Sequence, residues 1–230
     1  MSNHLAIATV TATLQRALQA SVQLDVDGAR VTTVRPTDIG NGTPETGVNL
    51  FLYQIITNAA LSNMDSPRFR NKGDFSKRQT ALELHYMVSV YGDDNELAPQ
   101  RLIGSVVRTL NDIGNISPDL IRETCEDASL SFLNGSTLAN NFQQLTVMSL
   151  DLNLEDLSKT WSIFFQAPYI LSVAYKVMVV TLESEMPLRV GLPIRQRQTG
   201  GAAPYLNQPM IDQVIPQTGR LTPIMADSTL

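Results

Sequence analysis

Residues 154–184, LEDLSKTWSIFFQAPYILSVAYKVMVVTLES, decide the fold that we expect for this chain. They hold the only Trp of the sequence, two of its seven Phe and two of its six Tyr. The pattern predicts an amphipathic helix over residues 154–164, capped by Asn153, and a stop at Pro168. A long strand over residues 169–182 should follow, with alternate residues from Tyr169 to Val179 on one face. The segment contains no catalytic set, so it favours a structural protein over an enzyme.

Periodicity predicts further elements on the N-terminal side of this unit. We expect helices over residues 3–20, 95–112 and 118–127, and strands over 29–34, 48–57, 81–91 and 145–152. Ser2 or Asn3, Asn95 and Ser117 are the expected caps of the three helices. The strand over 48–57 is apolar on both faces and should be covered on both sides. This irregular mixture of long strands and helices predicts an α+β domain with a largely antiparallel sheet flanked by helices.

The composition changes near residue 185, which divides the chain into two expected parts. Residues 1–184 should form the α+β domain, and residues 185–230 are rich in Pro, Gly and Gln. Such a segment buries too little apolar surface to order alone, so we expect an extended tail that becomes ordered against a partner. The tail can add a strand to the sheet edge of a neighbouring subunit.

Charge and cysteine content exclude several classes of protein. The net charge of −5 argues against a general nucleic-acid binder. Cys125 is the only cysteine, so no intramolecular disulfide forms, which suits a reducing compartment. The first 15 residues do not resemble a signal peptide, and no apolar run reaches the length of a membrane span. We therefore expect the protein to be cytoplasmic when it is made.

A basic stretch over residues 66–78 interrupts this acidic chain. It contains Arg68, Arg70, Lys72, Lys77 and Arg78 against one acid, a local net charge of +4 that leaves −9 for the remainder. A basic loop on an acidic body can dock on an identical neighbour, head to tail. The alternative interpretation is a solvated surface loop.

The residue types that carry chemistry are sparse. His4 and His85 are the only histidines, and neither has a Cys or carboxylate at the spacing of a metal site. No phosphate-binding glycine loop is present, and Asp93 and Asp94 are better explained by turn and helix-cap chemistry than by calcium binding. Cys125 is best explained as a small helix residue. We therefore expect no catalytic residue, no metal and no cofactor.

Three aromatic residues lie at helical spacing in the decisive segment: Trp161, Phe164 and Phe165. Packing in the core is the default interpretation of such a cluster. A protein–protein anchor is the alternative, because Trp and its aromatic neighbours are common at interface centres. These three residues and the five basic residues above are our candidates for subunit and partner contacts.

Three segments together resemble one family: VNLFLYQIITNAALSNMD (48–65), LELHYMVSVYGDDNELAPQRLIGSVVRTLND (82–112) and residues 154–184. They are similar to the small terminator, or cap, proteins of contractile injection systems, the phage-tail-like particles that drive an inner tube through a contracting sheath. The likeness covers most of residues 5–184 and rests on the ensemble, because no single motif is catalytic. Some relatives carry a further C-terminal domain, which the tail after Ser184 does not match.

The resemblance implies a non-enzymatic structural protein. It implies a tail-terminator-like α+β subunit that assembles as a homohexameric ring on the baseplate-distal end of the inner tube and sheath and ends their polymerisation. Its partners would be itself, the tube protein and the sheath protein, and it would become part of the injection particle after assembly. Two alternatives stay open: another ring-forming adaptor at the tube end or baseplate, and, more remotely, a small enzyme with an unrecognised site.

Overall fold

A computed structural model describes residues 2–62, 79–140, 144–165 and 167–183 of the 230-residue chain. The helices are α1 (Ala6–Asp25), α2 (Ala59–Ser62), α3 (Ala98–Ile113), α4 (Pro118–Cys125) and α5 (Leu154–Ile163). The strands are β1 (Arg30–Thr32), β2 (Gly47–Thr57), β3 (Gln79–Tyr91), β4 (Asn115–Ile116), β5 (Leu145–Leu150) and β6 (Ser172–Glu183). Short 3-10 helices span Pro36–Asp38, Ala128–Leu133 and Leu138–Asn140. The expected tail lies outside the described residues.

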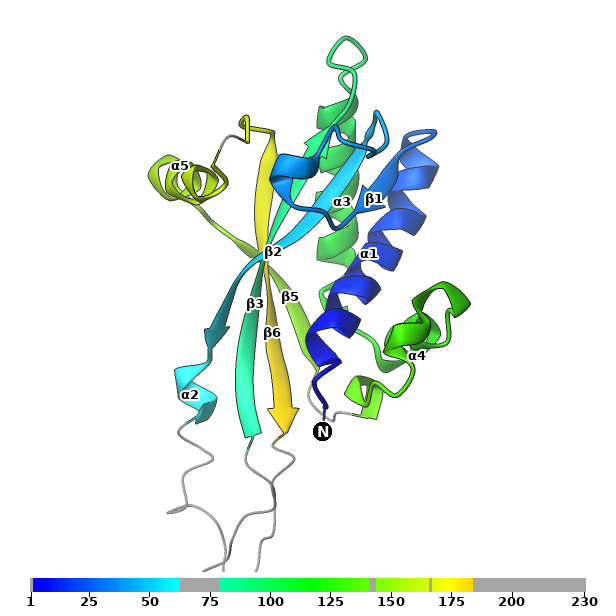
Figure 1. Ribbon diagram of the computed structural model, residues 1–230, viewed down its shortest axis with the longest axis vertical. Coiled ribbons are helices and arrows are strands. Elements are labelled where there is room, and N and C mark those ends of the chain that lie inside the picture. Colours follow the sequence, from blue (N-terminus) through cyan, green and yellow to red (C-terminus); the bar gives the residue numbers. More distant parts are fainter. Residues whose placement is uncertain (1, 63–78, 141–143, 166, 184–230) are drawn as a thin grey trace, which may run out of the picture. The chain divides into compact units, whose positions relative to one another are not determined.

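The strands form one six-stranded sheet in the order β1-β2-β3-β6-β5-β4. Only β1 and β2 pair in parallel, and the four other pairings are antiparallel. Helices α1, α3 and α4 cover one face of the sheet, and α5 lies on the other (Figure 1). The predicted α+β fold with a largely antiparallel sheet is therefore confirmed.

The core lies between the sheet and the α1–α3–α4 layer. Alternate residues of β3 point into it, as the sequence pattern predicted: Leu82, Leu84, Tyr86, Val88 and Val90. The Tyr86 side chain is completely buried, and its hydroxyl lies 2.9 Å from Thr11 Oγ1 on α1. Burial raises the pKa of Tyr86 far above its usual value, so this phenol stays neutral and ties α1 to the central strand.

Two β-bulges shift the alternation of side chains along the sheet. One lies in β2, where the register against β3 shifts between Leu52 and Gln54. The other lies in β6, because Leu82 pairs with Val180 while Leu84 pairs with Val177. The extra residue turns Val180, and not Val179, toward the core. The predicted alternation through Val179 is therefore wrong beyond Val177.

Other boundaries and caps differ from the sequence prediction. Strand β6 begins at Ser172, three residues later than expected, and the backbone before it is irregular. Helix α1 begins after Leu5, and α3 begins after Leu97, so neither Asn3 nor Asn95 is the N-cap. The amide of Asn95 instead donates to the Asp93 carboxylate in the preceding turn. The predicted caps Ser117 and Asn153 are confirmed, since each side chain accepts a main-chain N–H in the first turn.

Candidate interaction surface

Helix α5 lies on the sheet through an aromatic cluster. The rings of Trp161 and Phe164 meet edge to face at 5.7 Å, and Phe164 meets Phe51 of β2 at 5.5 Å. Trp161 also meets Tyr169 at 5.5 Å, and its Nε1 donates to Ser172 Oγ at 3.1 Å. The Trp161 side chain is only 6% exposed, so in the isolated subunit it anchors α5 to the strands.

The other side of α5 and the loop after it expose apolar side chains. Phe165 is 79% exposed, Ile163 75% and Tyr169 61%. Exposed groups of large apolar side chains are typical of protein–protein contact sites. Of the three predicted aromatic candidates, Trp161 is buried, Phe164 is half-buried, and Phe165 is open to a partner.

The exposure of Ile163 and Tyr169 was missed by the sequence analysis. Trp161 and Phe164 are three residues apart and lie on the side of α5 that packs on the sheet, while Ile163 falls off that side. Phe165 is exposed because helix α5 ends at Ile163, so helical spacing no longer places its side chain. Helical spacing therefore contained a signal for Ile163. The exposure of Tyr169 had no such signal, because it depends on where the strand begins.

The five basic candidates, Arg68, Arg70, Lys72, Lys77 and Arg78, lie outside the described residues. Their role in contacts stays a prediction. The described ends of the connection that contains them are α2 and the start of β3, at the same end of the sheet as the last residue of β6 (Figure 1).

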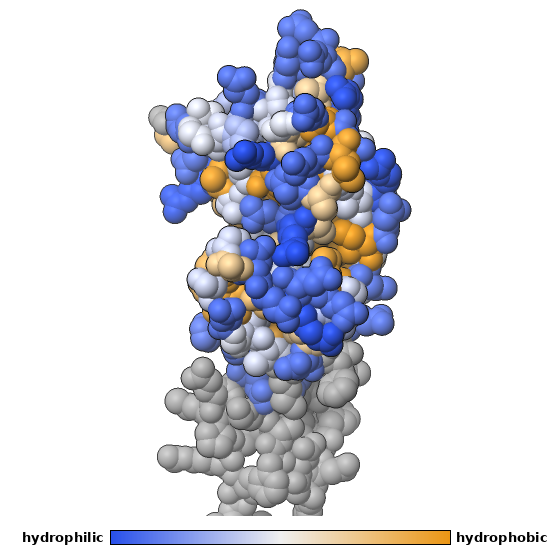
Figure 2. All heavy atoms as spheres, turned by 90° about the vertical axis from the view of Figure 1, so that its right-hand side faces the viewer, coloured by the Kyte–Doolittle hydropathy of each residue, from blue (hydrophilic) through white to orange (hydrophobic). Residues whose placement is uncertain are grey.

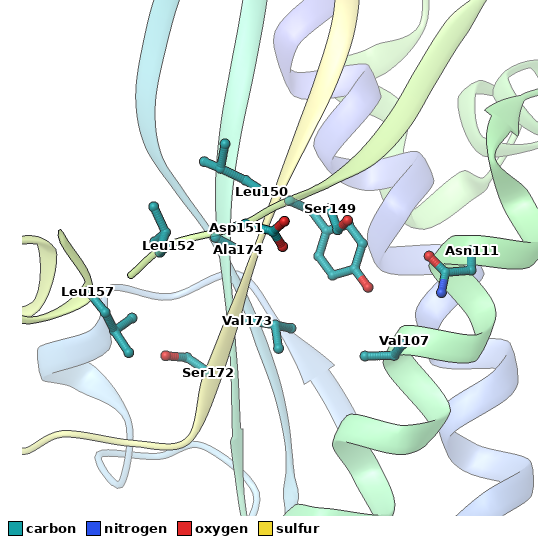
Figure 3. Close-up of a pocket in the computed structure, with 11 residues that line it drawn as sticks. Val107, Asn111, Ser149, Leu150, Asp151, Leu152, Leu157, Ser172, Val173 and Ala174 are labelled. Carbon is teal, nitrogen blue, oxygen red and sulfur yellow. The ribbon is translucent and has the colours of Figure 1, made fainter. Parts of the chain in front are cut away.

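A pocket of about 390 Å³ opens where β5 separates from β6 (Figure 3). Its lining comes from α3, the end of β5, α5 and the start of β6: Val107, Asn111, Ser149, Leu150, Asp151, Leu152, Leu157, Ser172, Val173, Ala174 and Tyr175. Among these residues there is no His, Cys or Lys, and the one carboxylate in the lining is Asp151. The lining therefore lacks the Ser–His and Cys–His pairs that are common in nucleophilic catalysis.

His85 is a buried titratable group on the sheet face that bears α5. Its side chain pairs in register with Lys176, and its Nε2 lies 3.9 Å from Glu83 Oε2 without a hydrogen bond among the described residues. Burial lowers the pKa of His85, Lys176 lowers it further, and Glu83 opposes the shift. The imidazole is therefore a neutral part of the packing at neutral pH.

The opposite face, over α1 and α4, is mainly hydrophilic with separate apolar spots (Figure 2). Ion pairs connect its elements: Arg16 with Asp127 at 3.1 Å and Arg108 with Asp25 at 2.6 Å. Hydrogen bonds from Ser129 and the nearby Arg16 guanidinium lower the pKa of Asp127. This face thus resembles an ordinary solvated surface more than the α5 face does.

The described residues contain no group of three or more His, Cys, Asp or Glu side chains placed to hold a metal ion. Within the same ranges, no helix combines the length and the apolar character that crossing a membrane requires.

The comparison with protein families gives the relationship directly. The model of the Pvc16 N-terminal domain matches residues 9–196, most of the chain. The chain belongs to the Pvc16 N-terminal domain family. The resemblance to terminator and cap proteins that the three sequence segments predicted is thereby confirmed. A search of curated proteins gave no match to this Pvc16 N-terminal domain chain.

The solved structures that resemble this Pvc16 N-terminal domain include a sheath/tube terminator and a tube-terminating cap. The first is the sheath/tube terminator of PVC, an extracellular contractile injection system, in its extended state, with 11% identity, a TM-score of 0.52, and coverage of 84% of this chain and 62% of that one. The second is the tube-terminating cap of the anti-feeding prophage, with 14% identity, a TM-score of 0.44, and coverage of 80% and 58%. The chain therefore spans about three-fifths of the length of each. At this identity, the first match shows a shared fold.

Proposed function

We propose that this protein is a structural terminator of a contractile injection system. In this role it forms a ring on the baseplate-distal end of the inner tube and sheath and ends their polymerisation. The observation that carries the proposal is the fold shared with a sheath/tube terminator over 84% of this chain, together with membership of the Pvc16 N-terminal domain family.

The surface chemistry supports a ring. A closed ring of identical subunits needs heterologous contacts, in which one patch meets a different patch on the next copy. The basic stretch over residues 66–78 and the acidic remainder of the chain carry the opposite charges that such a contact can use. The exposed apolar side chains of the α5 region offer a further patch. We propose six copies per ring, with the tube protein and the sheath protein as further partners.

A terminator occupies the place of the next tube ring and presents a far face on which no ring can stack. This work needs shape and contacts and no reaction, so we propose that the protein is not an enzyme. It would assemble in the cytoplasm and then stay with the particle.

Deleting the gene tests the proposal. We expect tubes and sheaths of irregular length, or particles that lose their sheath, when their lengths are measured by electron microscopy. Re-expression of the full chain is the control and should restore a single length. Particles of normal, uniform length and stability without the protein would overturn the terminator function.

A further inference from the structure

Strand β2 leaves most of one edge open among the described residues. Its eleven residues pair along almost their full length with β3, but β1 covers only Gly47, Val48 and Asn49 on the other side. In the described part of the chain, no strand pairs with that edge from Leu50 to Thr57.

One hydrogen bond identifies the residues of β2 whose main-chain N–H and C=O groups point to the open edge. The N–H of Asn58 donates to the carbonyl of Ala81 at 2.9 Å, so Asn58 faces the β3 side. Because antiparallel strands alternate in the direction of their main-chain groups, Ile56 and Gln54 face β3 as well. Ile55 and Thr57 then direct their N–H and C=O groups to the open edge.

Apart from the bulge between Leu52 and Gln54, the edge lacks the features that usually prevent strand addition. Exposed edges are normally protected by charged residues, by proline or by a covering element. Residues 50–57, LFLYQIIT, contain no charged residue and no proline. Ile55 is 48% exposed and Ile56 38%. A strand with these properties is suited to binding another strand.

We propose that this edge binds residues 188–194 of a second copy of the chain as an added antiparallel strand. The sequence of this segment, LRVGLPI, alternates apolar residues with Arg189, Gly191 and Pro193. The apolar row is Leu188, Val190, Leu192 and Ile194, the pattern of a strand with one buried face.

Pro193 determines which side chains would lie on which face. It has no N–H, so in an added strand its position must point away from β2. The even-numbered residues of the segment, including Val190 and Leu192, then form the main-chain hydrogen bonds to the β2 edge. Since Ile55 pairs with Leu84, which points into the core, this apolar row lies beside Ile55 on the helix side.

The one charged residue of the segment, Arg189, agrees with this assignment. Arg189, like Pro193, is an odd-numbered residue of the segment, so its side chain would lie on the face opposite to the apolar row. This is the face of Ile56 and of its register partner Glu83. A guanidinium is thus placed on the same face as the Glu83 carboxylate of β3, the strand next to β2. The missing N–H of Pro193 and the charge of Arg189 therefore predict the same orientation of the added strand.

A second copy fits the site better than the chain's own tail. Strands β2 and β6 run in the same direction, so Thr57 and Glu183 lie at the same end of the sheet (Figure 1). A chain that passes from Glu183 to the outer edge of β2 would cross the connection from β2 to β3 at that end. Connections rarely cross at one end of a sheet. Pairing between copies avoids this crossing, and it rests on the proposed ring, in which each copy gives one strand and accepts another.

Mixed single-cysteine proteins test the pairing. In a Cys125→Ser background, one protein carries Gln54→Cys, and a second carries Arg189→Cys or Gly191→Cys. Gln54 and these tail positions belong to the same face and to non-hydrogen-bonded positions, where Cβ atoms come closest. We expect disulfide-linked dimers on oxidation of the concentrated mixture. Leu192→Cys is the matched control on the other face and should give few.

The outcomes separate the possible occupants. No dimer from the mixtures, or equal dimer with Leu192→Cys, overturns the proposal. A chain carrying both cysteines that closes only on itself overturns it in favour of the chain's own tail. Cross-linked copies, combined with particles of normal length in the strain without the protein, would overturn the terminator function alone. Rings on tube ends without cross-links would overturn the strand pairing alone.

A proline pair in β2 gives an independent test. Ile55→Pro removes an outward N–H, so we expect a normal melting temperature and at least a tenfold loss of cross-linking. Ile56→Pro removes an N–H that faces β3 and should lower the melting temperature. Undiminished cross-linking of the Ile55→Pro protein would contradict the proposal.

Discussion

At the scale of single residues, the α5 region separates an aromatic side chain that holds the fold from one that is free for a partner. Trp161 is 6% exposed and donates a hydrogen bond to Ser172, whereas Phe165 is 79% exposed. We expect Trp161→Ala to lower the free energy of unfolding by about 3–5 kcal/mol, because it opens a large cavity against the sheet. Denaturant titration followed by circular dichroism measures this loss.

Phe165→Ala is the matched variant on the same helix end. It should change the free energy of unfolding by less than about 0.5 kcal/mol, since an exposed side chain loses little packing. It should weaken binding to tube ends in a sedimentation assay. Normal stability of the Trp161→Ala protein would refute the role of Trp161 in holding the fold. Normal tube binding of the Phe165→Ala protein would refute the role of Phe165 as a partner contact.

Two glycines make a second residue-scale comparison. A Cβ on Gly47 would lie 2.4 Å from the Arg30 carbonyl oxygen, where β1 and β2 pair in parallel. Gly47→Ala must displace β1 and should lower the free energy of unfolding by about 1–3 kcal/mol, as overpacking does.

Gly104, in helix α3, has nothing within 4 Å of an added Cβ, so Gly104→Ala should raise the free energy of unfolding by about 0.4–1 kcal/mol. Thermal melting of both variants gives the signs, and a stable Gly47→Ala protein would contradict the close pairing of β1.

At the scale of elements, the basic stretch gives a charge-reversal prediction. Changing Arg68, Arg70 and Lys72 to Glu should leave the melting temperature nearly unchanged, since the stretch has little apolar content, and should weaken ring or tube contacts. An exposed ion pair contributes only about 0.2–1 kcal/mol, but the six copies of the proposed ring would act together. Tube-end binding at low and high salt is the measurement, because salt screens such contacts. If the variant capped tubes normally at both salt concentrations, the stretch would be a solvated loop.

The elements also show how far the sequence could lead. Strand β3 was predictable because every second side chain enters one core, and α5 because Asn153 marks its start and Trp161 its buried face. The bulge in β6 was not predictable, since apolar residues continue on both sides of Val177 and only the pairing with β3 shows the extra residue.

Strand β2 shows the same limit at a candidate site. Its apolar residues indicated cover on both sides, but residues 54–57 are exposed. Apolar composition shows that a strand needs cover, and only the strand order shows that the cover is missing among the described residues. The candidate surfaces were therefore predictable as residue types but not as places in the fold.

At the scale of the whole molecule, the division that we predict at residue 185 leads to a truncation prediction. Removing residues 187–230 should leave the α+β domain folded, because its described core is built entirely from residues before 184. We expect particles with a broader length distribution than those capped by the full chain, but a narrower one than particles without the protein. The domain keeps the α5 surface, and the truncation removes the strand that we propose for the β2 edge of the next copy. Ile55→Pro in the full chain should reproduce this intermediate phenotype, since it blocks the same pairing from the acceptor side. The measurement is the length distribution of particles by electron microscopy in four strains: full chain, deletion, truncation and Ile55→Pro. If the truncated chain were as inactive as the deletion, the tail would be the main capping element and the domain alone would not hold the ring.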